Sequence, residues 1–186
     1  ITTTGYASTD FNKWPEFSKF ILVMLMFSGA CAGSTGGGMK VSRLVIMLKT
    51  VKKELLSYLH PRTVRKVKFN GRIVEHEVIR GINVYMIAYA FVLMFSVLII
   101  SIDNFDFTSN FTAVVATLNN IGPGLNIVGP TGNFSMYSNL SKIVMILDML
   151  AGRLELFPML LLINPYTWKE IKIRKNKKNK KEGHSI

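Results

Sequence analysis

Gly33-Ser34-Thr35-Gly36-Gly37-Gly38-Met39-Lys40 separates two apolar segments, residues 17–32 and 41–48. A continuous helix over both segments would be about 48 Å long at about 1.5 Å per residue, whereas a bilayer core is about 30 Å thick. Each of the four glycines would cost such a helix roughly 1 kcal/mol relative to alanine. We therefore predict one membrane segment over residues 17–50 that is broken at membrane depth. Broken backbone is tolerated there only where protein buries it or where it lines a watery cavity, which points to a permeation path.

The composition places the chain among integral membrane proteins. Of its 186 residues, 49% are hydrophobic, the mean hydropathy is +0.29, and the apolar residues form long runs. The net charge is +12, but the basic residues are clustered, so positively charged inner loops explain them better than nucleic-acid binding does. The one cysteine, Cys31, lies in an apolar run with no metal-ligand spacing around it, and we expect it to be a small packed residue.

Two further segments are long enough to cross a bilayer. Residues 82–102 carry no charge. Residues 140–163 form the last span, which contains Asp148, Arg153, Glu155 and Pro158. The proline predicts a kink near the end of this span.

The basic residues predict the orientation of the spans. Residues 40–80 contain 11 Lys or Arg and residues 169–181 contain 8, whereas residues 103–141 contain none. The basic connector and the tail are therefore predicted to lie inside, and the segment between the last two spans outside.

That outer segment has the pattern of a pore loop. Residues 107–118 are moderately apolar and too short to span, so they predict a re-entrant helix with Asp106 or Thr108 as its N-cap. The following residues 119–125 contain Gly-Pro-Gly and cannot continue the helix. The chain thus predicts an all-α membrane protein with one broken span, two further spans and one re-entrant pore loop.

The start of the chain repeats part of this pattern. Residues 1–16 read as a loop, and Thr2-Thr3-Thr4-Gly5-Tyr6 precedes the broken span as Asn119-Asn120-Ile121-Gly122 precedes the last span. The chain therefore holds one and a half copies of a span–pore loop–span repeat, and we expect it to be a fragment of a longer protein. In the basic connector, Asn70-Gly71 predicts a short hairpin, with Val67 and Phe69 before the turn and Ile73 and Val74 after it.

Both glycine segments are candidate potassium-filter strands. A potassium filter replaces the water shell of the ion with backbone carbonyls, and glycine permits the backbone dihedrals that this requires. A Thr-Thr-Gly turn is commonplace in an exposed loop, but its position before a span favours a filter. The candidate ion-binding carbonyls belong to Thr4, Gly5, Asn120, Ile121 and Gly122.

The chain resembles the Trk/Ktr/HKT superfamily of potassium transporters, most closely the bacterial TrkH-type subunit. Four strings carry the resemblance: Thr3-Thr4-Gly5-Tyr6, Cys31 to Val41 with its glycines, Asn119-Asn120-Ile121-Gly122-Pro123-Gly124, and Gly152-Arg153-Leu154-Glu155. The resemblance implies four repeats around one pore, with Gly5 in the third filter segment and Gly122 in the fourth. It also implies that Gly33, Ser34, Thr35, Gly36, Gly37 and Gly38 form a gating loop under the filter, with Lys40 beside it and Arg153 reaching into the cavity.

The resemblance also implies a division of the chain and a set of partners. Residues 1–50 would be the filter segment and broken inner span of the third repeat, 51–80 a cytoplasmic connector, 81–168 the fourth repeat, and 169–186 a cytoplasmic tail. The protein would carry K⁺ across the bacterial cytoplasmic membrane without a resident cofactor. Two filter segments cannot close a four-sided cage, so the remaining N-terminal repeats of the same protein would complete it. Members of the family form homodimers and bind a cytoplasmic ring of nucleotide-binding, TrkA-like subunits.

Each assignment has an alternative. The glycine stretch could be a helix-packing face of small residues, Arg153 could pair with Asp148 or Glu155, Lys40 could be a plain inner anchor, and the tail could bind anionic lipid. The whole chain could be a nonconducting membrane-anchored interaction protein, which would tolerate Gly5→Ala and Gly122→Ala. A membrane enzyme using Arg153, Glu155 and Asp148 is a further alternative, but no nucleophile, metal constellation or phosphate motif supports it.

Overall fold

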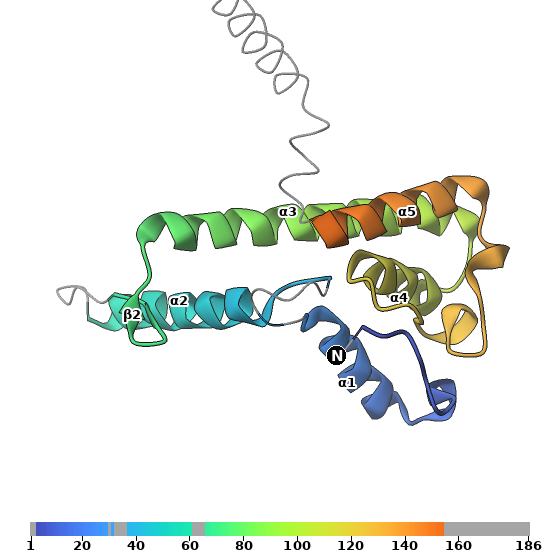
Figure 1. The fold of residues 1–186 in the computed structure, drawn as a ribbon, viewed down its shortest axis with the longest axis horizontal. Helices are drawn as coiled ribbons and strands as arrows, with labels where there is room; N and C mark the ends of the chain where they lie inside the picture. The colour runs from blue at the N-terminus through green and yellow to red at the C-terminus, as the bar shows by residue number, and fades with distance from the viewer. Residues whose placement is uncertain (1–2, 30, 32–36, 61–65, 155–186) are drawn as a thin grey trace, which may run out of the picture.

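The computed structural model describes residues 3–29, 31, 37–60 and 66–154, and the helices dominate it (Figure 1). The predicted kink at Pro158, the residue Glu155 and the basic tail 169–186 lie outside these residues. The elements in chain order are η1 (Phe11–Lys13), α1 (Glu16–Phe27), α2 (Val41–Leu59), β1 (Lys68–Phe69), β2 (Arg72–Ile73), α3 (His76–Ile100), η2 (Ser101–Asp103), α4 (Phe107–Leu118), η3 (Asn126–Val128), η4 (Phe134–Met136) and α5 (Asn139–Leu154).

The predicted break in the first membrane segment is confirmed, because α1 and α2 are separate helices. α1 begins directly after Pro15, whose fixed φ suits a helix start. The two sides of the break come back together where the Gly29 amide donates to the Met39 carbonyl over 2.9 Å. A Cβ on Gly29 would lie 2.5 Å from that carbonyl oxygen, so the approach requires glycine.

Among the described residues, α3 with η2 is the one helix long and apolar enough to cross a membrane. It begins at His76, whereas the apolar run alone predicted a start at residue 82. The difference arises because helical hydrogen bonding already includes the polar residues before the apolar run, such as Glu77 and Arg80. Large apolar side chains remain exposed along its length, for example Phe91 and Leu98.

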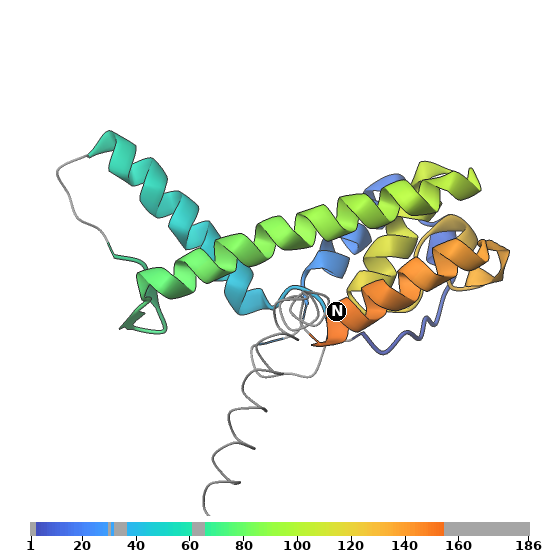
Figure 2. The ribbon, with the colours of Figure 1, turned by 90° about the horizontal axis from the view of Figure 1, so that it is seen from above.

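The predicted re-entrant helix is confirmed as α4, and its N-cap is Asp106. The Asp106 carboxylate accepts hydrogen bonds from the Ser109 amide (3.1 Å) and the Ser109 hydroxyl (2.6 Å). α4 packs against α3 and α5, which run antiparallel beside each other (Figures 1 and 2). Nine of the twelve α4 residues are buried, so this short helix is the centre of the fold.

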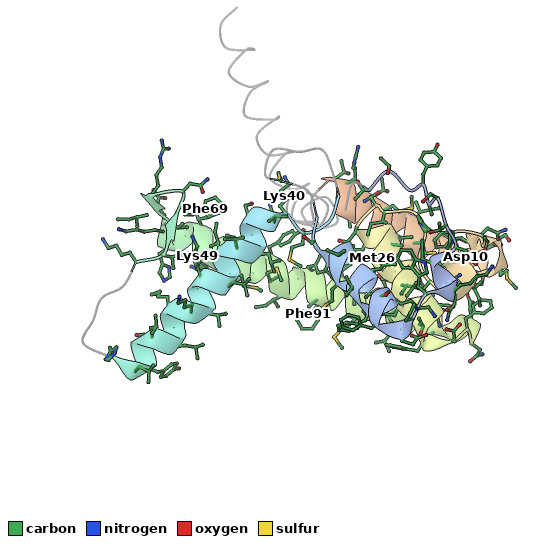
Figure 3. The ribbon with its side chains drawn as sticks, turned by 90° about the horizontal axis from the view of Figure 1, so that it is seen from below. Asp10, Met26, Lys40, Lys49, Phe69 and Phe91 are labelled. Atoms are coloured by element: carbon green, nitrogen blue, oxygen red, sulfur yellow. The ribbon has the colours of Figure 1, made fainter. Side chains whose placement is uncertain are left out.

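The hairpin predicted around Asn70-Gly71 is also confirmed. β1 and β2 pair antiparallel, and both turn residues have positive φ, +49° and +78°, as a type I′ turn requires. The hairpin lies against α2, where the Lys49 ammonium donates to the Lys68 carbonyl (3.0 Å) and lies 5.8 Å from the centre of the Phe69 ring (Figure 3). The hairpin end and the α4 end are opposite ends of an elongated molecule (Figure 1).

Candidate ion pathway

The two candidate filter segments lie side by side. A Cβ on Gly122 would be 3.2 Å from the Gly5 Cα, and a Cβ on Gly5 would be 3.2 Å from the Ile121 carbonyl oxygen. The fold therefore brings a segment at the start of the chain to the end of α4, as the sequence predicts for two strands of one filter.

The two segments also share a backbone pattern. Thr3 and Gly5 have φ of +55° and +78°, Asn120 and Gly122 have +53° and +110°, and the residue between each pair has negative φ. Both segments thus have a residue of positive φ, a residue of negative φ and a glycine of positive φ in the same order. Glycine permits such backbone dihedrals, which a carbonyl-lined filter requires.

Hydrogen bonds to three helices hold Asn119 and Asn120, where the second candidate filter segment follows α4. The Asn119 Oδ1 accepts from the Tyr89 hydroxyl of α3 over 3.0 Å, and its Nδ2 donates to the Val115 carbonyl over 3.0 Å. The Asn120 Nδ2 donates to the Met149 carbonyl of α5 over 3.0 Å. These side-chain bonds tie the end of α4 to both neighbouring helices.

Three glycines lie against the same end of α4. A Cβ on Gly38 would be 2.5 Å from the Asn119 Oδ1, and a Cβ on Gly37 would be 2.8 Å from the Asn119 carbonyl oxygen. A Cβ on Gly152 of α5 would overlap the Leu118 carbonyl oxygen. The described part of the predicted gating loop therefore touches Asn119, the residue directly before the second candidate filter segment.

The conformation of Gly37 and Gly38 tests the alternative that the glycine stretch is a helix-packing face of small residues. Gly37 and Gly38 are buried but lie in no helix, and Gly38 has a φ of +78°. A helix-packing face of small residues is therefore wrong at these two positions. Gly33, Ser34, Thr35 and Gly36 lie outside the described residues.

A second set of hydrogen bonds ties the outer parts of the two repeats together. The Asn12 Oδ1 accepts from the Asn126 amide (2.9 Å), and the Asn12 Nδ2 donates to the Asn126 carbonyl (3.2 Å). The Asn126 side chain in turn donates to Asp106, the N-cap of α4, over 2.9 Å. The hydrogen bond from Ser109 lowers the pKa of the Asp106 carboxyl below its ordinary value, against a smaller opposing effect of desolvation, so Asp106 is an anionic acceptor at neutral pH.

The other predicted residues are placed as follows. Lys40 is half-buried directly before α2, and Arg153 is exposed in the last turn of α5. Asp148 is buried and accepts from the Ser96 hydroxyl over 2.8 Å, while its Oδ2 has no hydrogen-bond partner among the described residues. The alternative that Arg153 pairs with Asp148 is therefore wrong.

Sequence reasoning missed the roles of Tyr89, Asn119 and Gly152. Asn119 and Gly152 belong to quoted motifs, but no contact was predicted for them. One signal was available for the tyrosines, because Tyr85 and Tyr89 are four residues apart in an apolar span and so share a helix face. Within the described residues, no group of three or more His, Cys, Asp or Glu side chains is placed to hold a metal ion.

A family model described as a cation transport protein, TrkH, matches residues 1–169 of the chain. The chain belongs to the TrkH family. It is 39% identical over 169 residues to the Trk system potassium uptake protein TrkH of Escherichia coli K12 and 40% identical over 168 residues to that of Vibrio parahaemolyticus. These matches cover 91% and 90% of this chain but 35% and 34% of the relatives, so the chain spans about a third of their length.

The likeness extends to the fold. The crystal structure of the potassium transporter TrkH from Vibrio parahaemolyticus matches with a TM-score of 0.78 at 39% identity, covering 90% of this chain and 35% of that one. The fold is therefore that of an all-α membrane transporter with pore-loop repeats, as the sequence predicted.

Proposed function

We propose that this TrkH-family chain is the C-terminal part of a potassium uptake transporter. The observation that carries the proposal is the pairing of Gly5 with Gly122, each at the end of a segment whose φ alternates in sign. The relatives are named potassium uptake proteins, which supports the choice of ion.

In this mechanism K⁺ loses water as it meets the carbonyls of Thr4, Gly5, Asn120, Ile121 and Gly122. Residues 3–6 and 119–124 contain no Asp or Glu, so the field of the carbonyl dipoles would set selectivity without a carboxylate. The hydrogen bonds at Asn119 and Asn120 keep the fourth segment in place while the ion changes its ligands.

We propose that the gate lies directly below the filter, on the cytoplasmic side. Gly37 and Gly38 touch the end of α4, and we infer that the complete loop, Gly33 to Gly38, closes the pathway beneath the filter. Arg153 would place a positive charge in the exit path, where it repels a leaving cation until the gate opens. Lys40, at the junction of the loop and α2, would move with the loop.

The filter needs further repeats. A pocket of about 660 Å³ opens beside the paired segments and is lined by Thr4, Gly5, Gly122 and, from α5, Met145 and Met149. We propose that the remaining N-terminal repeats of the protein occupy this side and complete the cage. The basic connector and tail would lie in the bacterial cytoplasm, where a TrkA-like regulatory ring would bind, and the transporter would be a homodimer.

The test is uptake of a rubidium tracer by liposomes that carry the intact gene product, with potassium or sodium as competitor. We expect potassium but not sodium to compete, and the Gly122→Ala variant to lose that preference. Gly81→Ala is the matched control, because a Cβ at Gly81 meets nothing within 4 Å. If the intact protein with its regulatory subunit moves no rubidium, the nonconducting anchor replaces this proposal. If rubidium moves but Gly122→Ala keeps the preference, the carbonyl filter at Gly122 is wrong.

A further inference from the structure

Asn119 is almost completely enclosed, with 1% of its surface exposed, and it directly precedes the fourth filter segment. Its Nδ2 donates to the Val115 carbonyl of its own helix, which fixes the amide so that Oδ1 points away from α4. Two separate parts of the chain then meet at this one oxygen: the Tyr89 hydroxyl donates to it, and a Cβ on Gly38 would lie only 2.5 Å from it.

A row of stacked side chains, the ladder, leads from Arg43 of α2 through Tyr85 to Tyr89. The guanidinium carbon of Arg43 lies 4.2 Å from the centre of the Tyr85 ring, and the Tyr85 and Tyr89 rings are stacked with centres 6.3 Å apart. Both tyrosines are buried, with 5% and 4% of their surfaces exposed. Arg43 is in the first turn of α2, which begins at Val41, three residues after Gly38.

We propose that Asn119 is a positioning residue that couples the start of α2 to the fourth filter segment. A shift of α2 reaches Asn119 by two routes, through Gly38 and through the ladder of Arg43, Tyr85 and Tyr89. Because Asn119 is joined by one peptide bond to Asn120, a pull on its side chain that displaces its backbone also changes the direction of the first filter carbonyls. The proposal rests on the proposed function, since it assigns the control of a filter that the function requires.

The same helix supplies a matched control. The Tyr137 hydroxyl donates to the Asn110 Oδ1 over 3.2 Å, which is a second buried Tyr–Asn hydrogen bond on α4. Asn110 lies in the first half of α4, far along the helix from Asn119. A purely structural role for such a bond predicts the same consequence at both sites, whereas the coupling role predicts an effect on selectivity at Tyr89 alone.

The experiment compares Tyr89→Phe, Tyr137→Phe and Gly122→Ala in the intact protein, using rubidium influx into liposomes with potassium and sodium as competitors. We expect Tyr89→Phe to lower the preference for potassium over sodium about fivefold, the equilibrium effect of one net hydrogen bond. We expect Tyr137→Phe to keep the wild-type preference while showing a similar loss of thermal stability. Equal preferences in the two tyrosine variants would overturn the coupling.

The Gly122→Ala arm separates the two proposals. If it loses the preference while Tyr89→Phe keeps it, the filter stands and the role of Asn119 is wrong. If Gly122→Ala also keeps the preference, the carbonyl filter at Gly122 itself is wrong.

The α2 end of the ladder is tested by a double-mutant cycle of Arg43→Gln and Tyr89→Phe. We expect Arg43→Gln alone to lower the preference about twofold, the scale of one partly exposed cation–π contact, and to add nothing in the Tyr89→Phe background. Two effects that multiply, or no effect of Arg43→Gln, would show that the ladder does not connect α2 to the filter. Spatial proximity is no proof of coupling, and the cycle measures the coupling directly.

Discussion

The two candidate filter segments, residues 3–5 (the proposed third) and 120–122 (the proposed fourth), have the same alternation of φ but different supports. The fourth segment follows the buried helix α4. Asn119, directly before the segment, is bonded to α3 and to α4 itself, and Asn120 is bonded to α5. The third segment lies against the fourth at Gly5, and its outer loop is bonded to the fourth repeat through Asn12. The same backbone form is thus held by surrounding helices in residues 120–122, whereas in residues 3–5 it is held by contact with the fourth repeat.

The residue types agree with this difference. Asn120 has a φ of +53°, and asparagine enters the left-handed region more easily than most side chains do. Thr3 has a φ of +55°, and a β-branched residue is rarely found there. Such a conformation persists only where the surroundings impose it, so the third segment depends more on its neighbours than the fourth does.

The largest expected effect comes from removing the support of the fourth segment at Gly152. In Gly152→Ala the new methyl would overlap the Leu118 carbonyl, so α5 must move away from α4. We expect a loss of about 3 kcal/mol in the free energy of unfolding, at the upper end for overpacking. Thermal unfolding of the intact protein in detergent measures it, with Gly81→Ala as the control in open space. A Gly152→Ala variant as stable as the control would show that α5 does not support this segment.

The next effect compares the two filter glycines directly. Alanine at Gly122 meets a φ of +110°, which costs roughly 1–3 kcal/mol for a side chain with a Cβ, whereas alanine at Gly5 meets +78°, closer to the left-handed helical region. Gly122→Ala should therefore reduce the preference for potassium over sodium more than Gly5→Ala does. Competition assays of rubidium uptake give both values. The reverse order would mean that the third segment is the more rigid of the two.

Local signals in the sequence predicted the elements around the candidate filter segments. The glycines of the loop predicted the broken span, Asp106 predicted the start of α4, and Asn70-Gly71 predicted the hairpin. Each of these signals acts over a few residues, because capping, turn formation and helix breaking are properties of the local backbone.

The contacts that hold the filter could not be predicted in the same way. Tyr89 and Asn119 are 30 residues apart, and an apolar span offers no period that would show which of its polar residues faces the pore helix. The requirement for glycine at position 152 likewise arises only because α5 lies against the Leu118 carbonyl. Which side chains meet is decided by the packing of three helices, and the sequence of any one of them leaves it open.

A smaller effect is expected from cutting the outer bond of the third segment. Asn12→Ala removes both hydrogen bonds to the Asn126 backbone, which are exposed and together are worth about 1 kcal/mol. The third segment should loosen, and the preference for potassium should fall about fivefold or less. Asn133→Ala is the control, since Asn133 caps η4 in the same outer region and accepts hydrogen bonds from the amide and hydroxyl of Ser135 within that turn. Equal behaviour of the two variants would show that the outer bond does not position the third filter segment.

The smallest effect is a pH dependence at the N-cap of α4. Hydrogen bonding by Ser109 lowers the pKa of Asp106 in the folded protein below its ordinary value of 3.8. The anionic form therefore stabilises the fold above about pH 4, and this stabilisation is lost as the pH falls through the lower, folded pKa. Because Asp106 is largely exposed to solvent, we expect less than about 1 kcal/mol. Melting temperatures of wild type and Asp106→Asn should differ by a constant amount between pH 8 and pH 5 and converge below about pH 4. A difference that persists unchanged to pH 3 would assign the role of Asp106 to its shape as an acceptor, and the outer bond through Asn126 would then not depend on charge.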